Sequence, residues 1–321
     1  MLSYLIRRLG YGVLVVLGVL LFLFALFFLV TKPDDIARRA LGDKAPPAVI
    51  EQWKKNHGYD RPLYPTAGHW TDNLLVDHFQ SMLTFDFGRS DADDSPISER
   101  LLSGMKPSLM LTVPAFVLGL VFAIGLSLLV TLFRESYIDE LALILGVLGM
   151  SIPGLLYIIG GQFVLGKLLR WFPVSGFDPD WSLVARFLAL PVTVGVVAGL
   201  GRGVRFYRTV FIEEINKDYV RTAWAKGCGE GQVMSRHVLR NTLIPILTDV
   251  VVEIPFLFTG ALLTEAFFGI PGLGSLTVDA IFGNDFSVLR TMVYIGSLLF
   301  ILGQILTDVS YTLVDPRVRF D

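Results

Sequence analysis

Two carboxylates in the C-terminal third of the chain have the type and spacing of residues that do chemistry inside a membrane. Asp249 and Glu253 lie four residues apart, so they share one face of any helix that carries them. The surrounding stretch is apolar, and Glu253 lies about 15 Å beyond its first residue by the helical rise. An ionisable group at that depth is costly and marks a substrate or proton pathway by default. The alternative is a carboxylate hydrogen-bonded inside a helix bundle, which is the interpretation favoured for Asp249.

No other group of residues in the sequence forms a recognisable catalytic or metal-binding pattern. Residues 161–168 come within one position of a phosphate loop, but Leu168 stands where a hydroxyl should hold magnesium. Residues 199–203 are glycine-rich but follow no strand, and we expect them to end a membrane span. No nucleophile lies beside a base in a known context. We therefore expect no catalytic residue, no metal and no cofactor in this chain.

A long polar and basic stretch lies just before the two carboxylates. Residues 202–245 read RGVRFYRTVFIEEINKDYVRTAWAKGCGEGQVMSRHVLRNTLIP and hold eight Lys or Arg residues against four acids. Apolar runs long enough to cross a bilayer flank it on both sides. Two interpretations remain open: a surface on which a cytoplasmic protein docks, or an ordinary loop whose basic residues only fix the topology.

The pattern inside this stretch predicts a short helix, a corner and a second helix. Ile215, Tyr219, Ala223 and Trp224 recur at helical spacing, and residues 227–229 (GCG) then interrupt. A glycine costs about 1 kcal/mol against alanine in a helix interior, so two within three residues mark a corner. The residues that share one face of the second helix are Val233, Met234, His237, Val238 and Asn241.

The composition around these stretches is that of a membrane protein. Of the 321 residues, 53% are hydrophobic and 17% are charged, whereas an ordinary soluble domain carries about 25% charged residues. The formal net charge of −2 indicates no nucleic-acid partner. The single cysteine, Cys228, excludes an internal disulfide.

Six apolar stretches are long enough to cross a bilayer as helices, since about 20 residues at 1.5 Å each span the hydrocarbon. The first follows Arg7 and Arg8 without a cleavage site, so we expect an uncleaved anchor. Prolines inside several stretches fit a bundle around a cavity. The expected spans are 9–30, 109–132, 141–164, 183–201, 243–263 and 288–309.

The expected architecture is an all-α membrane protein in three parts. These parts are an N-terminal transmembrane helix (1–30), a long extracytoplasmic loop region (31–107) and a core (108–321). The tryptophans and scattered apolar residues of 31–107 favour a small folded cap over disorder.

The distribution of basic residues orients these spans. With the N-terminus inside, the cytoplasmic pieces hold thirteen Lys or Arg residues, whereas the short outer pieces hold only Lys167 and Arg170. We therefore expect both termini and the basic stretch on the cytoplasmic side.

The basic stretch also resembles a known signature. Residues 218–227 read DYVRTAWAKG and residues 236–241 read RHVLRN, which resembles the EAA loop of bacterial ABC importer permeases. The general form is E-A-A, three residues, Gly, nine residues and I-x-L-P. With Gly227 as its glycine, Arg240 replaces the proline and His237 the isoleucine, and both departures are usual in the dipeptide and oligopeptide branch.

The resemblance implies that residues of about 213–231 form a coupling helix that sits in a cleft of an ATPase subunit. It assigns that role to a set around the corner. The ATPase-docking residues are then Tyr219, Arg221, Thr222, Ala223, Ala225, Lys226, Gly227, Glu230, Arg236 and His237.

Other stretches are similar to the same family. Residues 264–274 read TEAFFGIPGLG and are expected to shape the outer mouth of the pathway, with a plain surface turn as the alternative. Residues 59–63 (YDRPL), 86–90 (DFGRS) and 284–286 (NDF) also match, as does the closing DPR from residue 315. The candidate outer-mouth residues are Glu265, Pro271, Gly272 and Gly274.

Taken along the whole chain, these motifs identify it as resembling one of two permease subunits of a bacterial dipeptide or oligopeptide importer in the cytoplasmic (inner) membrane. The resemblance implies as partners a second homologous permease, two ATPase subunits that hold ATP and magnesium, an extracytoplasmic peptide-binding protein, the peptide substrate and membrane lipid. The main alternative is a proton-coupled secondary transporter that uses Glu253. A signalling or scaffold membrane protein, which would have no substrate pathway, is a third.

Overall fold

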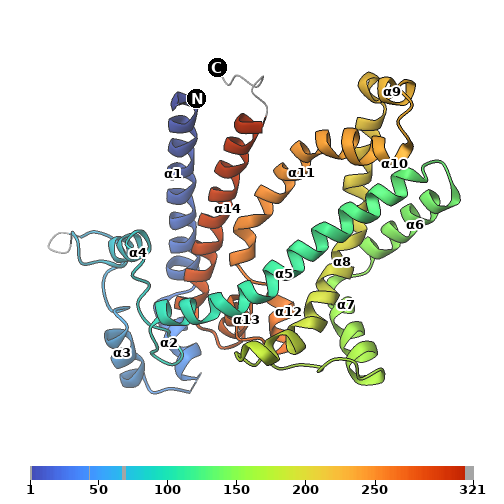
Figure 1. The fold of residues 1–321 in the computed structure, drawn as a ribbon. Helices are drawn as coiled ribbons and strands as arrows, with labels where there is room; N and C mark the ends of the chain where they lie inside the picture. Colours follow the sequence, from blue (N-terminus) through green and yellow to red (C-terminus); the bar gives the residue numbers. More distant parts are fainter. Residues whose placement is uncertain (1, 43, 67–69, 315–321) are drawn as a thin grey trace.

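The chain folds into helices of very different lengths (Figure 1). The computed structural model describes residues 2–42, 44–66 and 70–314, and these contain helices and no strand, which confirms the all-α class. The expected helix stop at residues 315–316 lies outside the described residues. In chain order the helices are α1 (Leu2–Phe24), η1 (Ala25–Val30), α2 (Pro33–Leu41), α3 (Pro47–Asn56), α4 (Leu74–Leu83), α5 (Ile97–Leu132), α6 (Tyr137–Ser151), α7 (Gly154–Gly161), η2 (Gln162–Leu168), α8 (Trp181–Ile215), α9 (Asp218–Ala225), α10 (Glu230–Val233), η3 (Met234–Val238), α11 (Leu239–Glu253), η4 (Ile254–Phe258), α12 (Leu262–Phe268), α13 (Leu273–Phe282) and α14 (Phe286–Val314).

Within the described residues, five helical segments are long and apolar enough to cross a membrane. A sixth candidate is the pair α6 and α7–η2, which is bent by 93° and counts as a span only if the two halves cross together. The five segments are Ile6–Val30, Ile97–Leu132, Leu183–Ile215, Glu230–Phe258 and Phe286–Val309.

The sixth candidate covers the expected span at 141–164, but its helix is broken at Pro153, one of the prolines inside the expected spans. Helix α6 ends at Ser151, and Ile152 is extended, with φ −85° and ψ 122°. The residue before a proline is pushed out of the helical region by the proline ring, so Pro153 explains the break. Gly154 then begins a new helix in a different direction.

Helix α8 continues through residues 199–203, the glycine-rich stretch at which the fourth membrane span was expected to end, so these glycines do not end the helix. A Cβ at Gly201 would lie 2.7 Å from the carbonyl oxygen of Gly146 in α6, and one at Gly203 would lie 2.7 Å from Cβ of Ala123 in α5. These glycines therefore let α8 approach both neighbours closely instead of stopping it. Helix α5 likewise begins at Ile97, before the expected span at 109–132.

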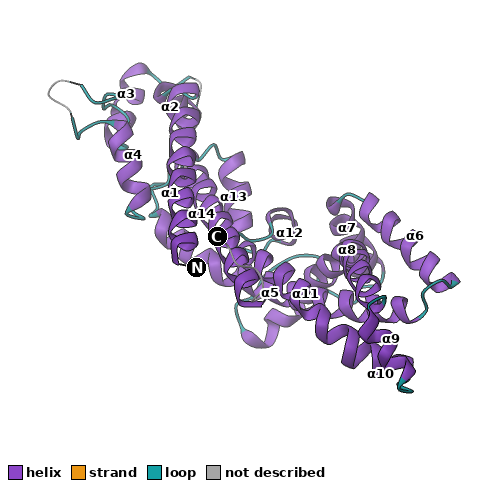
Figure 2. Cartoon of the chain, turned by 90° about the horizontal axis from the view of Figure 1, so that it is seen from above, coloured by secondary structure: helices purple, strands orange, loops and turns teal. Residues whose placement is uncertain are grey.

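The long helices form two groups. Helices α1 and α14 lie side by side and are joined by an ion pair between Arg8 and Asp308 at 2.7 Å. Helices α6, α7 and α8 lie at the opposite side, and α5 and α11 run between the groups (Figure 2). The start of α1, the end of α14 and the short helices α9 and α10 lie at one end of the molecule, and α2, α3, α12 and α13 at the other (Figure 1).

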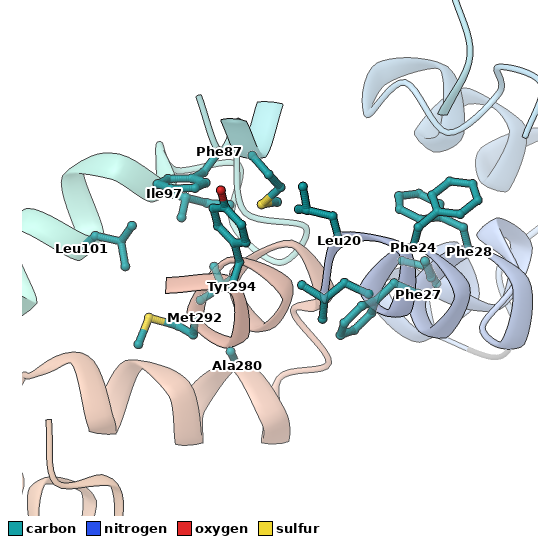
Figure 3. Close-up of a cluster of buried hydrophobic side chains, with 14 of the residues drawn as sticks. Leu20, Phe24, Phe27, Phe28, Phe87, Ile97, Leu101, Ala280, Met292 and Tyr294 are labelled. Carbon is teal, nitrogen blue, oxygen red and sulfur yellow. The ribbon is translucent and has the colours of Figure 1, made fainter. Parts of the chain in front are cut away.

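The segment between η1 and α5 is here called the cap (residues 32–96), and its described residues form helices with a buried core, as predicted against disorder. Its helices α2, α3 and α4 contribute buried side chains, including Ile36 and Met82. A core of aromatic and aliphatic residues joins the cap to α1, η1 and α14, with Phe24, Phe28 and Tyr294 among its members (Figure 3). The cap therefore rests on the same two helices that carry the chain termini.

Candidate functional sites

The middle of the basic stretch folds as predicted into an elbow, defined here as α9, the turn 226–229 and α10, whereas its residues 202–215 belong to α8. Gly227 takes φ +82°, a left-handed conformation that favours glycine, and the chain turns there. Val220 of α9 and Val233 of α10 are fully buried on the inner side of the elbow, beside Val238 of η3. The sequence pattern thus identified the corner and three buried residues of the second helical part, Val233, Met234 and Val238, whereas His237 is half-buried and Asn241 is exposed. Ile215, predicted on the first helix, is instead the last residue of α8.

The structure brings the predicted docking residues together around this corner, with one correction. Ala223 is buried in the core beneath the elbow, so it fixes α9 instead of presenting a contact surface. Tyr219 and His237 are half-buried. The predicted docking residues that are exposed are Arg221, Thr222, Ala225, Lys226, Gly227, Glu230 and Arg236.

Polar contacts hold the elbow to the bundle. The Tyr219 hydroxyl donates to Glu214 Oε1 at 2.5 Å, and burial together with this carboxylate raises the pKa of Tyr219 to about 12. The guanidinium of Arg134, in the turn between α5 and α6, lies 5.7 Å from the ring centroid of Trp224 in α9. The elbow is therefore attached to α8 and to the α5–α6 turn.

Asp249 and Glu253 line one cavity of about 380 Å³, here called the charge cavity, between α5, α8 and α11. Each carboxylate has a partner on α8. The Tyr207 hydroxyl donates to Asp249 Oδ2 at 2.6 Å, and Arg202 Nη2 donates to Glu253 Oε1 at 2.8 Å. The expected shared face is present, and Asp249 is hydrogen-bonded as favoured. Arg202, the first residue of the basic stretch, lies within helix α8.

Glu265, predicted at the outer mouth, is fully buried where α5, α12 and α13 meet. Its carboxylate accepts hydrogen bonds from Ser108 Oγ at 2.8 Å and from the backbone N–H groups of Ala261, Gly274 and Ser275 at 2.9, 2.7 and 3.1 Å. We call these contacts the Glu265 junction.

The glycines of the same stretch are needed for the junction. A Cβ at Gly272 would overlap Glu265 Oε2, and one at Gly274 would lie 2.7 Å from the backbone nitrogen of Leu262. Both glycines are buried, and Pro271 is the exposed member of the predicted set. The stretch is therefore a buried junction between three helices and not a plain surface turn.

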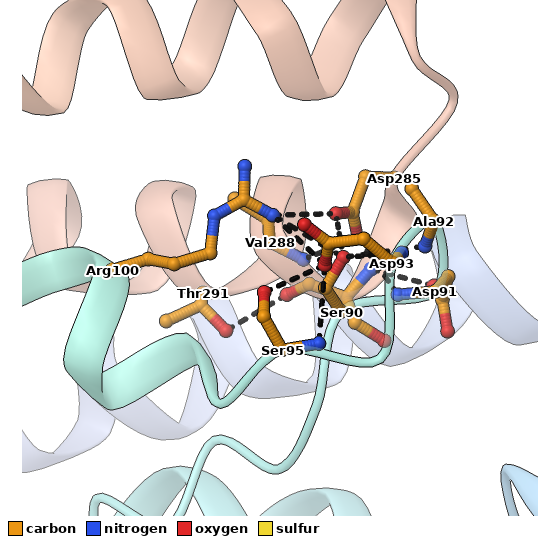
Figure 4. A network of polar contacts seen from close by, with 10 residues as sticks. Ser90, Asp91, Ala92, Asp93, Ser95, Arg100, Asp285, Val288 and Thr291 are labelled. Atoms are coloured by element: carbon orange, nitrogen blue, oxygen red, sulfur yellow. Dashed lines mark hydrogen bonds and ion pairs between the residues drawn. The ribbon is translucent and has the colours of Figure 1, made fainter. Parts of the chain in front are cut away.

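At the same end of the molecule, a polar network joins the cap to the start of α14 (Figure 4). Ser90 Oγ donates to Asp285 Oδ2 at 2.5 Å, and the backbone N–H of Ser287 donates to Asp91 Oδ2 at 2.8 Å. The Tyr59 hydroxyl donates to Asp91 at 3.2 Å. Burial is the main cause that raises the pKa of Asp91. Three stretches singled out in the sequence, at 59–63, 86–90 and 284–286, thus meet in one network.

Comparison with known proteins covers the whole chain. A model of the binding-protein-dependent transport system inner membrane component matches residues 108–320, and a model of the N-terminal part of the same membrane components matches residues 1–112. The chain belongs to this family. It is an inner-membrane permease of the ABC importer class.

The curated relatives of the permease agree in length as well as in sequence. The glutathione transport system permease protein GsiC of Escherichia coli (strain K12) is 32% identical over 330 residues, covering 100% of both chains. GsiC of Shigella boydii gives the same figures. A permease of Brucella abortus (strain 2308), whose name provisionally assigns it to a peptide transport system, is 31% identical over 328 residues with the same coverage.

Sequence reasoning missed the partners that hold the candidate residues in place. Ser108, Tyr207 and Arg208 belong to no motif and become visible only when the helices are packed. Arg208 donates from Nε and NH2 to the two carboxylate oxygens of Asp139 in α6, each at 2.6 Å. Arg202 carried one usable signal, a basic residue directly after an apolar run that could pair with an intramembrane acid.

Proposed function

We propose that this permease is one of two membrane subunits of an ATP-driven peptide importer. The observation that carries the proposal is full-length similarity to permeases of glutathione and peptide transport systems, together with a polar elbow at one end of an apolar bundle. A second homologous permease completes the pathway, and membrane lipid surrounds the pair. Two ATPase subunits bind ATP and magnesium, for which this chain carries no motif.

In this proposal the elbow is the surface held by an ATPase subunit. Its support is the cluster of exposed polar residues around a rigid, glycine-dependent corner that is fastened to α8. The start of α1, the end of α14 and the elbow share one end of the molecule, which is the cytoplasmic end in this assignment. Both termini are then cytoplasmic and the cap is extracytoplasmic.

At the other end, the cap is the proposed contact for the peptide-binding protein. It carries a polar cavity of about 660 Å³ whose walls include Arg61, Asp77, Arg89 and Arg290. The network of Ser90, Asp91 and Asp285 fixes this surface to α14, so that receptor docking acts on a membrane helix. The Glu265 junction lies at the same end and holds the outer ends of α5, α12 and α13 together.

Peptide then passes along the charge cavity, with Glu253 and Asp249 on its wall. ATP binding closes the ATPase dimer, the elbow is displaced, and α8 carries the displacement to the cavity. A proton-coupled transporter using Glu253 is the competing function, and it requires no ATPase.

Co-purification and uptake test the proposal. Gly227→Glu places a charged side chain at an exposed, left-handed corner, so we expect loss of the ATPase subunits from the purified complex while membrane insertion is retained. Gly42→Glu is the control, because Gly42 also has a positive φ, +94°, and no atom within 4 Å of its Cβ position, but lies in the cap. Normal co-purification of Gly227→Glu contradicts the docking surface. Uptake by this chain alone, driven by a pH gradient, contradicts the importer.

A further inference from the structure

The charge cavity holds an ion pair that this chain leaves open to its surroundings. The Arg202 side chain is 68% exposed and that of Glu253 is 34% exposed, although their atoms approach to 2.8 Å. Asp249 lies on the same wall and is engaged by Tyr207. The cavity therefore contains one guanidinium group and two carboxylates. Among the described residues, the guanidinium of Arg202 is bonded to Glu253, whereas Asp249 is bonded to Tyr207.

The pair lies within two helical segments that are long and apolar enough to cross a membrane, since Arg202 belongs to Leu183–Ile215 and Glu253 to Glu230–Phe258. Charged side chains in such segments are costly in hydrocarbon and by default face a bundle interior or a water-filled space. Because both side chains are open to their surroundings in this chain, we take the face that carries them to border a hydrated pathway in the assembled permease.

Glycines leave room beside the pair for a ligand group. Gly119 of α5 and Gly199 of α8 line the cavity, and neither has an atom within 4 Å of its Cβ position. Their missing side chains are thus not replaced by packing, unlike at Gly203, where Ala123 lies 2.7 Å away. The cavity is open where a small cationic group could approach Glu253.

We propose that the charge cavity is a binding site for the ammonium group of a translocated peptide, and that Arg202 is the resident cation that this ammonium displaces from Glu253. The excess of carboxylates over guanidinium groups favours a cation over an anion in this space. Arg202 neutralises Glu253 when no substrate is present, which avoids an unpaired charge at membrane depth. Its exposed side chain is free to turn into the hydrated pathway when the ammonium arrives.

This inference rests on the proposed import function and adds a substrate group and two residue roles to it. The test uses the complete importer with its receptor in proteoliposomes, supplied with one tripeptide in its free-amine and N-acetylated forms. The measured quantity is the ratio of ATP-driven uptake of the two forms. Each variant is compared with the wild type on the same receptor, so the receptor's own preference cancels.

Glu253→Gln removes the acceptor charge with little change in shape, and we expect the free-amine to acetylated ratio to fall about three- to tenfold. Arg202→Gln removes the competitor, and the ratio should stay at the wild-type value or rise. The double variant leaves neither charge of the pair without its partner, so we expect it to assemble even if a single variant does not, and its ratio should fall as in Glu253→Gln. Glu140→Gln, an exposed carboxylate on α6 outside the cavity, is the matched control and should leave the ratio unchanged.

Equal losses of uptake for both peptide forms in Glu253→Gln and Arg202→Gln would show that the pair is only structural and would overturn the inference. An unchanged ratio in a double variant that still transports would also overturn it. Failure of the proposed function looks different, because the wild-type assembly would then show no ATP-driven uptake of either form.

Discussion

Glu265 shows how one buried carboxylate can organise three helices. It lies in α12 and accepts bonds from α5 through Ser108 and from the start of α13 through Gly274 and Ser275. The Ser108 hydroxyl also accepts from the backbone N–H of Leu273 at 2.7 Å. A buried acceptor with this many donors is stabilising only while every donor remains in place.

Glu265→Gln is predicted to destabilise this junction. The amide places an N–H donor against the donors of Gly274 and Ser275, so we expect a loss of about 2–4 kcal/mol, read as a lower Tm of the purified permease complex. Ser108→Ala removes one donor and leaves Leu273 N–H unpaired, at a cost of about 1–3 kcal/mol. Ser103→Ala, at an exposed position on the same helix, is the control. Equal Tm values for Glu265→Gln and Ser103→Ala would contradict this role.

His78 predicts how the stability of the cap depends on pH. It packs in α4 against Phe24 and Phe28, and burial, followed by the charge of Arg290, lowers the pKa of His78 to about 3. Below about pH 6.5 the His78 side chain is therefore protonated in the unfolded chain but stays neutral in the folded cap. The free energy of unfolding then falls by about 1.4 kcal/mol for each pH unit between pH 6.5 and pH 3.

His78→Gln keeps a donor for the carbonyl oxygen of Leu20, which lies 3.1 Å from Nε2 of His78, but has no charge to gain. The wild type should therefore lose more thermal stability than His78→Gln between pH 6.5 and 4.5. Asp91, whose pKa burial raises, acts with the opposite sign and is common to both proteins, so the difference isolates His78. Parallel Tm curves for the two proteins would contradict the assignment.

At the level of the elements, the sequence predicted what local patterns encode. The elbow followed from two glycines and a helical apolar face, and the structure places its corner at Gly227. The ends of α8 and the break at Pro153 were harder, because a glycine or proline can either stop a helix or allow close packing. Residues 199–203 were expected to end the fourth membrane span, but the helix continues through them, and Gly203 makes a close contact with Ala123 that only the neighbouring helix reveals.

The sequence could identify single residues of the candidate sites, but not the partners that contact them. Glu253 could be found because a carboxylate in an apolar run is unusual, but its partner Arg202 is 51 residues away and on another helix. Glu265 could be located by resemblance, whereas its burial depends on α5 and α13 meeting around it. Such pairings arise from the packing of separate helices, so no regular spacing of residues in the sequence predicts them.

At the scale of the whole molecule, α8 connects the elbow with the charge cavity. Along α8, Arg202 lies in the charge cavity, Arg208 bonds to Asp139 of α6, and Ile215 at the end of the helix packs beneath the elbow. The helix is continuous between these points, so in the proposed mechanism it can transmit a displacement of the elbow to Arg202. The two-point contact between Arg208 and Asp139 ties α6 to α8, so we expect α6 to move with α8 in this mechanism.

Asp139→Asn is predicted to weaken this connection while the ATPases stay bound. The amide can accept only one of the two charged hydrogen bonds from Arg208, so we expect peptide uptake per ATP hydrolysed to fall about three- to tenfold in proteoliposomes. Glu140→Gln, the exposed neighbour on α6, controls for charge at this end of the helix. If Asp139→Asn keeps the wild-type ratio of uptake to hydrolysis, α6 does not move with α8, and α8 alone must carry the elbow's displacement to the cavity.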